Sequence, residues 1–268
     1  MTSLALPRQS CAITVLGGPT SVIDVGGLRI ITDPTFDEPG PHGYLTKTAG
    51  PAVEEDALGP VDLALISHDT HPDNLDDRGR AFAKTTKAIL AGPQAAARLG
   101  SPAIAVAPWS SRAVARGDGG GELTVLAVPA VHGPEDGERD AEGNVNCEVI
   151  GFVLSGDGLP TIYVSGDNAS IRTVAEISRR VPRIDVALLH AGAARVPPKF
   201  DGRRLSLDGR SAAAAAAVLG ADVVVPAHYD GWEHFSEGLA EVEAAFYDAG
   251  LTRLLQAPAH GTWIHLAR

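Results

Sequence analysis

The chain has 268 residues, and 44% of them are hydrophobic, which suits one large domain with a sizeable core and excludes a disordered chain. The formal net charge of −11 argues against a nucleic-acid partner, because an acidic surface repels phosphate backbones. The two cysteines form no CxxC pair, and no apolar run reaches the ~20 residues of a membrane span, so we expect a cytoplasmic protein without a membrane partner.

The first third of the chain is predicted to consist mainly of strands. Ala12–Leu16 ends at a Gly-Gly-Pro turn, and Ser21–Val25 is joined to Leu28–Thr32 by a Gly-Gly hairpin turn. Residues 34–60 are rich in proline and glycine, which predicts a long surface loop. Val61–Ile66 is a short apolar run and is expected to be a buried strand.

Strands and helices alternate in the rest of the chain. Further strands are predicted at Leu123–Val128, Val149–Leu154, Thr161–Val164, Ile184–Leu189 and Asp222–Val225, with closing strands at Arg253–Gln256 and Trp263–Leu266. Helices are predicted near Arg80 and at Ala95–Leu99, Ser170–Arg180, Ser211–Leu219 and Glu237–Ala249. No linker separates the two rough halves, 10–120 and 121–268, so we expect a single domain, a layered sandwich with two inner sheets and outer helices.

Histidines and carboxylates recur immediately after the predicted strands. Residues at strand ends are held by a rigid scaffold, and binding sites tend to collect there. Imidazole and carboxylate together suit Zn²⁺, Fe²⁺ or Mn²⁺, so the pattern predicts a metal site. The residues at these strand ends are His68, Asp73, His132, Asp167, His190 and His228.

The order of these residues resembles that of the metallo-β-lactamase superfamily. That family has an H-x-H-x-D-H cluster after an apolar strand, then a lone histidine, a bridging aspartate and a final histidine. The corresponding segments here are His68–Asn74, His132, Ser165-Gly166-Asp167 and Pro226-Ala227-His228, over nearly the whole chain. The chain is most similar to the branch of sugar-lactone hydrolases and other zinc-dependent hydrolases. The resemblance implies an α+β, four-layer αβ/βα sandwich.

One extra residue interrupts the family cluster in this chain. The family spacing puts the second histidine at Thr70, but the histidine is His71, so the family's aspartate and third histidine fall on Asp73 and Asn74. Asparagine binds metals more weakly than imidazole, and His190 on an adjacent strand end is an alternative ligand. The resemblance implies a first metal on His68, His71 and His132, a second on Asp73, Asn74 and His228, and a bridging Asp167.

Further roles are expected around these ligands. Asp73 and His71 are the candidate catalytic residues, and Asp73 is suited to orient the attacking water or take its proton. Asp33 and Asp69 are candidates for fixing imidazole tautomers through the distal ring nitrogen. The remaining two candidates, His234 and Trp232, follow the last predicted ligand closely and are expected near the pocket wall.

The predicted function is hydrolysis of a small lactone, amide or phosphoester by metal-activated water. The expected cofactor is one or two divalent ions, zinc first, with manganese or iron as alternatives. Two other functions stay open, a mononuclear non-haem iron oxygenase and a binding protein whose metal site has degenerated. The expected partner is a small-molecule substrate, and an oligomer is left open.

Overall fold

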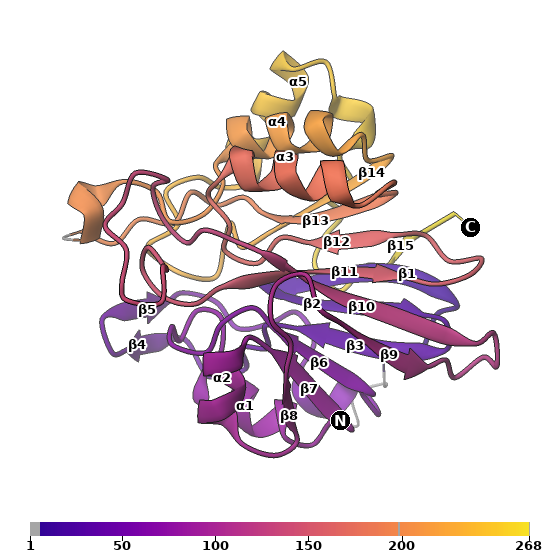
Figure 1. The fold of residues 1–268 in the computed structure, drawn as a ribbon. Helices are drawn as coiled ribbons and strands as arrows, with labels where there is room; N and C mark the ends of the chain where they lie inside the picture. Colours follow the sequence, from indigo (N-terminus) through magenta and orange to yellow (C-terminus); the bar gives the residue numbers. More distant parts are fainter. Residues whose placement is uncertain (1–5, 198, 268) are drawn as a thin grey trace.

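The computed structural model describes residues 6–197 and 199–267, and it places most of their strands in two sheets (Figure 1). The first sheet has the described order β15-β1-β2-β3-β6-β7-β8, and the second has β14-β13-β12-β11-β10-β9. The first contains β1 (Cys11–Gly17), β2 (Thr20–Val25), β3 (Leu28–Thr32), β6 (Leu63–Ile66), β7 (Ala88–Ala91), β8 (Ala103–Ala105) and β15 (Ile264–His265). The second contains β9 (Ser111–Ala115), β10 (Glu122–Pro129), β11 (Ile150–Ser155), β12 (Ile162–Val164), β13 (Val186–His190) and β14 (Val223–Ala227).

Helices cover the outer face of each sheet (Figure 1). The helices on the first sheet are α1 (Asp77–Ala83) and α2 (Pro93–Leu99), and those on the second are α3 (Ile171–Arg180), α4 (Gly209–Leu219) and α5 (Leu239–Asp248). Single 3₁₀ turns are η1 (Glu55–Ala57), η2 (Lys199–Gly202) and η3 (Thr252–Leu254). The predicted four-layer αβ/βα sandwich is therefore confirmed. Within the described residues, no helix combines the length and apolar character that a membrane crossing requires.

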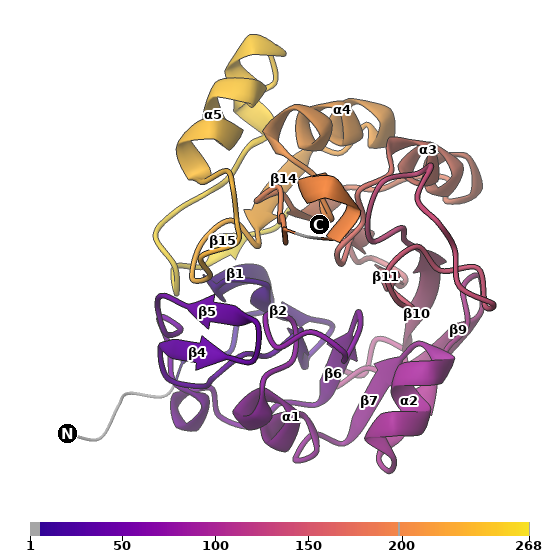
Figure 2. The ribbon, with the colours of Figure 1, turned by 90° about the vertical axis from the view of Figure 1, so that its left-hand side faces the viewer.

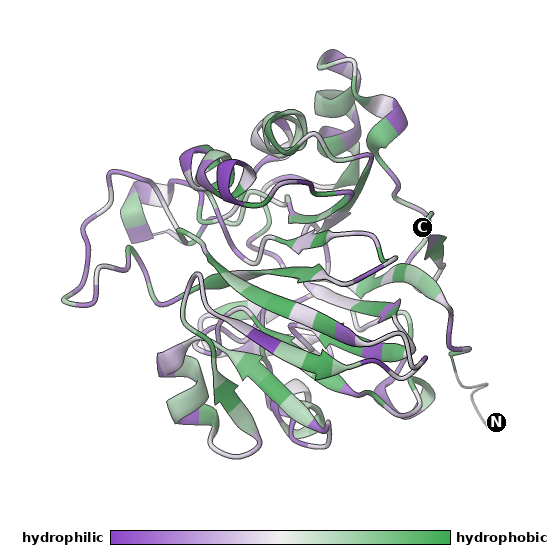
Figure 3. Cartoon of the chain, turned by 45° about the vertical axis from the view of Figure 1, so that its right-hand side comes forward, coloured by the Kyte–Doolittle hydropathy of each residue, from purple (hydrophilic) through white to green (hydrophobic). Residues whose placement is uncertain are grey.

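The core fills the space between the sheets and the two spaces beneath the helices. Ile30 belongs to the cluster between the sheets, whereas its neighbour Ile31 packs with α1 and α2, because successive strand residues point to opposite faces. Both side chains are fully buried. This burial on two faces explains why the strands read as nearly continuous apolar runs (Figure 3).

Side-chain caps set the starts of two helices in the second half. The Ser170 hydroxyl accepts a hydrogen bond from the Thr173 amide, as expected for the predicted start of α3. In α4 the cap is Asp208, whose carboxylate accepts from the Ser211 amide. The helix consequently begins at Gly209, two residues before its predicted start.

Two predictions about elements are wrong. Residues 34–60 are not only a loop, because they contain η1 and a hairpin of β4 (Gly40–His42) and β5 (Leu45–Lys47). The hairpin is held by a buried ion pair, in which Lys47 Nζ lies 3.0 Å from the Asp76 carboxylate. Arg253–Gln256 is not a regular strand, because η3 occupies part of it and only an isolated bridge joins Leu255 to Val224.

The two halves of the chain share the first sheet. Strand β15, near the C-terminus, pairs antiparallel with β1, so the second half completes a sheet built from the first. Strands β7, β8 and β9 were not predicted. The four residues of Ala88–Ala91 are too few to show a period, and most residues of β8 and β9 are exposed.

The strand directions bring the predicted ligands to one edge. Strand β3 is parallel to β6 in the first sheet, and β12, β13 and β14 are parallel in the second. Their carboxyl ends carry Asp33, His68, Asp167, His190 and His228. Figure 2 views the molecule from the side on which these loops and the β4–β5 hairpin lie. The site is therefore assembled from loops of both sheets.

Candidate metal centre

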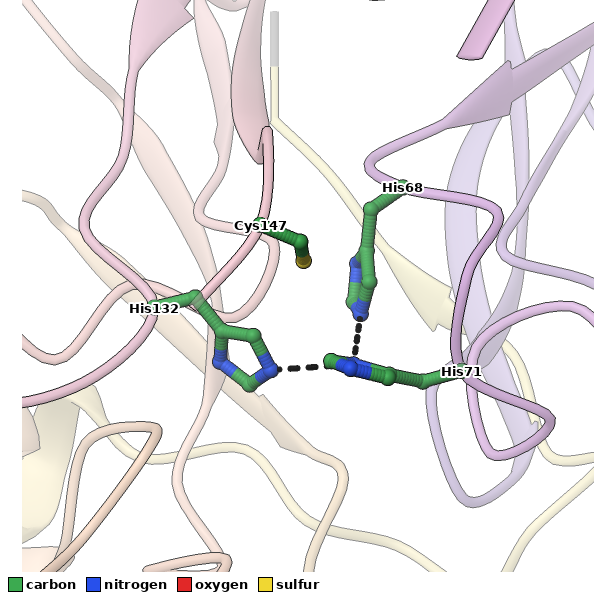
Figure 4. A group of neighbouring side chains, drawn as sticks. All are labelled: His68, His71, His132 and Cys147. Carbon is green, nitrogen blue, oxygen red and sulfur yellow. Dashed lines mark hydrogen bonds between the residues drawn. The ribbon is translucent and has the colours of Figure 1, made fainter. Parts of the chain in front are cut away.

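Three imidazoles converge where the loops after β6 and β10 meet (Figure 4). The Nδ1 atom of His71 lies 3.0 Å from His68 Nε2 and 3.1 Å from His132 Nε2. All three residues are buried. Two nitrogen ligands at about 2.1 Å from a tetrahedral Zn²⁺ are about 3.4 Å apart, so this spacing approaches that of a set of metal ligands.

The hydrogen bonds at the far side of the rings fix their orientation. The Nδ1 atom of His132 donates to the Leu205 carbonyl oxygen at 2.7 Å, and His68 Nδ1 lies 3.0 Å from the Ser67 hydroxyl. A neutral His132 with its hydrogen on Nδ1 has a lone pair on Nε2, directed at His71. Such a distal bond is how proteins fix the tautomer of a metal-binding histidine.

The environment also keeps these imidazoles neutral. Burial, followed by the neighbouring His132, lowers the pKa of His71 from 6.5 to about 3. Burial is likewise the first cause that lowers the pKa of His68 and of His132. A neutral imidazole is the form that binds a metal ion, so the cluster is ready for a cation at neutral pH.

A second cluster lies at the ends of β12, β13 and β14. One ligand atom from each of Asp167, His190 and His228 lies within 4.8 Å of the others. His190 Nδ1 donates to Asp167 Oδ1 at 2.8 Å, and His228 Nε2 lies 3.3 Å from the same oxygen. Burial favours a neutral Asp167, but His228 and the hydrogen bond from His190 outweigh it and hold the pKa of this carboxyl far below its ordinary value.

Asp73 joins the second cluster through two histidines. Its Oδ2 atom lies 3.3 Å from His228 Nε2 and 3.0 Å from His234 Nε2. Burial would raise the pKa of Asp73, but His234 and His228 lower it well below the ordinary value. Burial opposes a charged His228 as well, yet Asp167 and Asp73 raise its pKa. Two carboxylates thus favour the charged form of His228, at a place where a metal cation would satisfy the same charges.

The backbone around His228 is strained and tightly packed. His228 has a φ of 60°, a conformation that residues with a side chain adopt rarely and mostly at functional sites. Gly192, which follows β13, passes so close that an added Cβ would lie 2.0 Å from the His228 carbonyl oxygen. The sequence therefore needs glycine at position 192 to place the final predicted ligand.

The donor set fits a divalent cation. Asp167 Oδ2 is buried and has no hydrogen-bond partner among the described residues, and it lies 3.8 Å from His132 Nδ1, the ring nitrogen that donates to Leu205. Three mutually close imidazole nitrogens cannot all be satisfied by hydrogen bonds to one another, because His71 Nδ1 carries either one hydrogen or one lone pair. A cation bound at each cluster would satisfy these atoms.

Asn74 contacts two carboxylates through its amide nitrogen, while its buried Oδ1 atom has no hydrogen-bond partner among the described residues. Its Nδ2 atom donates to Asp33 Oδ2 at 3.4 Å and to Asp167 Oδ1 at 3.3 Å. Asp33 accepts in addition from the Ser67 amide at 2.7 Å, and burial raises its pKa to about 7. Asn74 and Asp33 thus link the ends of β3 and β6 to Asp167, whereas His190 contacts that carboxylate directly.

Asp69 and Trp232 take other positions near the site. The Asp69 carboxylate binds Arg98 at 3.0 Å and lies 3.6 Å from Arg80, so it orders arginines rather than a histidine tautomer. It also lines a cavity of about 460 Å³ that reaches His71. Trp232 is buried and bridged to Lys47 of the hairpin, with its ring 6.4 Å from that of His234.

Sequence reasoning did not place Cys147 and Tyr44 at the site. The sulfur of Cys147 and one nitrogen each of His68, His71 and His132 all lie within 4.8 Å of one another. Cys147 precedes β11, an antiparallel strand whose amino end lies at the edge where parallel strands end. The antiparallel direction of β11 is the signal that would have placed Cys147 at the site.

The ammonium group of Lys199 lies beside the first cluster. Lys199 Nζ lies 3.5 Å from His71 Nε2 and 3.1 Å from Asn146 Oδ1. The Tyr44 ring centroid is 5.2 Å from the same ammonium group. The half-buried Lys199 therefore places a positive charge beside an imidazole that the metal would use.

Comparisons with known proteins identify the family and support the fold. The family model described as the beta-lactamase superfamily domain matches residues 28–229. A metal-dependent hydrolase of Anaeromyxobacter dehalogenans is 28% identical over 251 residues, which cover 91% of this chain and 80% of that protein. The solved isothiocyanate hydrolase from Delia radicum gut bacteria has a TM-score of 0.80 at 19% identity and covers 96% of this chain and 99% of its own. A diiron β-hydroxylase from Streptomyces venezuelae has a TM-score of 0.67 at 13% identity, over 97% of this chain and 55% of its own.

Proposed function

The chain belongs to the metallo-β-lactamase superfamily and is a metal-dependent hydrolase, and from this premise we propose that it uses zinc to hydrolyse a small lactone, amide or phosphoester. The observation that carries the proposal is the presence of two neighbouring clusters, one of three histidines and one of Asp167, His190 and His228, with Asp167 Oδ2 3.8 Å from the His132 ring of the first. Such an arrangement suits two ions that share one carboxylate.

A divalent cation, when bound, supplies a water of lowered pKa and polarises the oxygen under attack. The chain's own residues then position the reactants. Asp73 remains ionised at neutral pH because His234 and His228 offset the cost of its burial. An ionised carboxylate accepts a hydrogen bond from the attacking water, orients it and takes its proton. His234, 3.0 Å from Asp73, stabilises that carboxylate.

The position of Lys199 favours a substrate that carries an anionic group. Its ammonium group is held by Asn146 and by the Tyr44 ring, close to His71. A carboxylate or phosphate oxygen bound there would be positioned beside the first metal by a charge-assisted hydrogen bond. The cavity of about 460 Å³ beside His71 and Tyr44 is large enough for a small molecule.

The metal content of the protein tests this proposal. Protein purified without a histidine tag is analysed for each metal, then reconstituted with zinc and assayed on lactones, amides and phosphoesters with and without a chelator. We expect about two zinc ions per chain and hydrolysis that the chelator abolishes. One iron per chain without hydrolysis would support the oxygenase alternative, and failure to bind any metal would contradict the proposal.

A further inference from the structure

We propose that Cys147 is the fourth ligand of the first metal, which makes that position a site of three histidines and one thiolate. The inference rests on the metal binding of the proposed function and adds a ligand to it. The sulfur and one nitrogen each of His68, His71 and His132 lie within 4.8 Å of one another. Figure 4 shows the sulfur directed into the space that the three rings surround.

The segment that carries Cys147 is anchored on both sides. The Glu148 carboxylate accepts hydrogen bonds from the amides of Gln94 and Ala95, at 2.9 and 3.1 Å. On the other side, Asn146 Oδ1 accepts from Lys199 at 3.1 Å. The sulfur therefore belongs to a backbone held to α2 and to the mouth of the site, rather than to a loose loop.

The residue at position 70 complements the sulfur. The family spacing would put a histidine there, but the residue is threonine, whose side chain lies close enough to Cys147 to affect its thiol. His71, one residue later, directs Nδ1 toward the other two imidazoles. A threonine side chain is smaller than an imidazole, so it leaves room for the sulfur beside the three histidines.

Metal binding at this position would replace the S–H bond of Cys147 with a sulfur–metal bond, and the proton would pass to solvent. A thiolate with three imidazoles favours zinc or cobalt over manganese and magnesium, which prefer oxygen ligands. Together with the shared Asp167 carboxylate, these four ligands would leave the first metal without an open position for water. Activation of water would then fall to the second cluster, beside Asp73.

Cobalt spectroscopy tests the ligand directly. Metal-free wild type, Cys147→Ser and Cys11→Ser are titrated with Co²⁺ under reducing conditions, and the near-ultraviolet thiolate-to-cobalt band is recorded. Cys11 lies in β1, outside the cluster, and is the matched control. We expect the band in wild type and in Cys11→Ser, and its loss in Cys147→Ser although cobalt still binds.

Cobalt binding to wild type without this band, or a band that persists in Cys147→Ser, would overturn the inference. Wild type that binds no cobalt at all would instead contradict the proposed function. If Cys147→Ser does not fold, alkylation of wild type decides the question. Peptide mapping should then show Cys147 modified by iodoacetamide in metal-free protein and protected by one equivalent of zinc, and equal modification in both forms would refute ligation.

Discussion

The Nδ1 atom of His132 donates to the carbonyl oxygen of Leu205 at 2.7 Å, although 73 residues separate the two in the chain. The bond joins the loop after β10 to the segment before α4. It fixes the tautomer in which His132 Nε2 has a lone pair directed toward His71. The lone pair is therefore provided by the fold before any metal arrives.

Replacing His132 by alanine should remove the metal of the first cluster. The substitution deletes one of three converging nitrogens, so metal content should fall by about one ion per chain while the second cluster keeps its ion. Elemental analysis after dialysis measures the content. His265→Ala in the exposed end of β15 is the control and should retain the wild-type content. A fully loaded His132→Ala protein would show that the ligand assignment is wrong.

His190 and Asn74 can be distinguished as ligands of the second metal. His190→Gln keeps an amide donor toward Asp167 but removes the imidazole, so the second ion should be lost. Asn74→Ala should keep that ion, because Asn74 directs its NH₂ group toward the carboxylates of Asp33 and Asp167. It should nevertheless cost about 1–3 kcal/mol in unfolding free energy, as a buried hydrogen-bonding group is lost. If Asn74→Ala loses the second ion and His190→Gln keeps it, Asn74 is the ligand and His190 is not.

In the metal-free protein, His71 should stay neutral at pH values well below 6.5, the ordinary pKa of histidine. Burial and the neighbouring His132 lower its pKa to about 3, whereas the unfolded chain has the ordinary 6.5. The unfolded state therefore binds the extra proton first, and the contribution of His71 to stability decreases as pH falls from 6.5 toward 3. A proton-detected NMR titration, assigned with His71→Asn, should show no His71 transition between about pH 8 and about pH 5. A midpoint near the ordinary value would refute this.

Much of the fold follows from local patterns in the sequence. Strands such as Leu28–Thr32 are buried on both faces and end at turn residues, so their positions were predicted closely. The hairpin of β4 and β5 was missed because its stability comes from distant contacts. Lys47 pairs with Asp76, and Thr48 donates its amide hydrogen to the Gly231 carbonyl oxygen. No short segment of sequence contains that information.

The candidate site was predictable where ligands follow strands. His68, Asp167 and His228 stand at carboxyl ends of strands, and the direction of parallel strands brings them together. Cys147 instead precedes the amino end of β11, and it lies at the site because β11 runs antiparallel to β12. The pairing of Asp69 with Arg98 depends on the packing of α2, which the spacing of the histidines does not reveal.

Replacing Lys199 by methionine should weaken the binding of anionic substrates selectively. Methionine keeps most of the side-chain length but removes the charge beside His71 and Tyr44. Because Lys199 is only half-buried, a loss at the low end of the 1.5–3 kcal/mol range for charged hydrogen bonds is expected, which is about a tenfold rise in KM. Substrate pairs that differ only in a carboxylate measure the effect, and Lys84→Met, at an exposed position, is the control. The neutral member of each pair should keep its KM in both variants. An equal rise for both members would show that Lys199 supports the site structurally and does not recognise the anion.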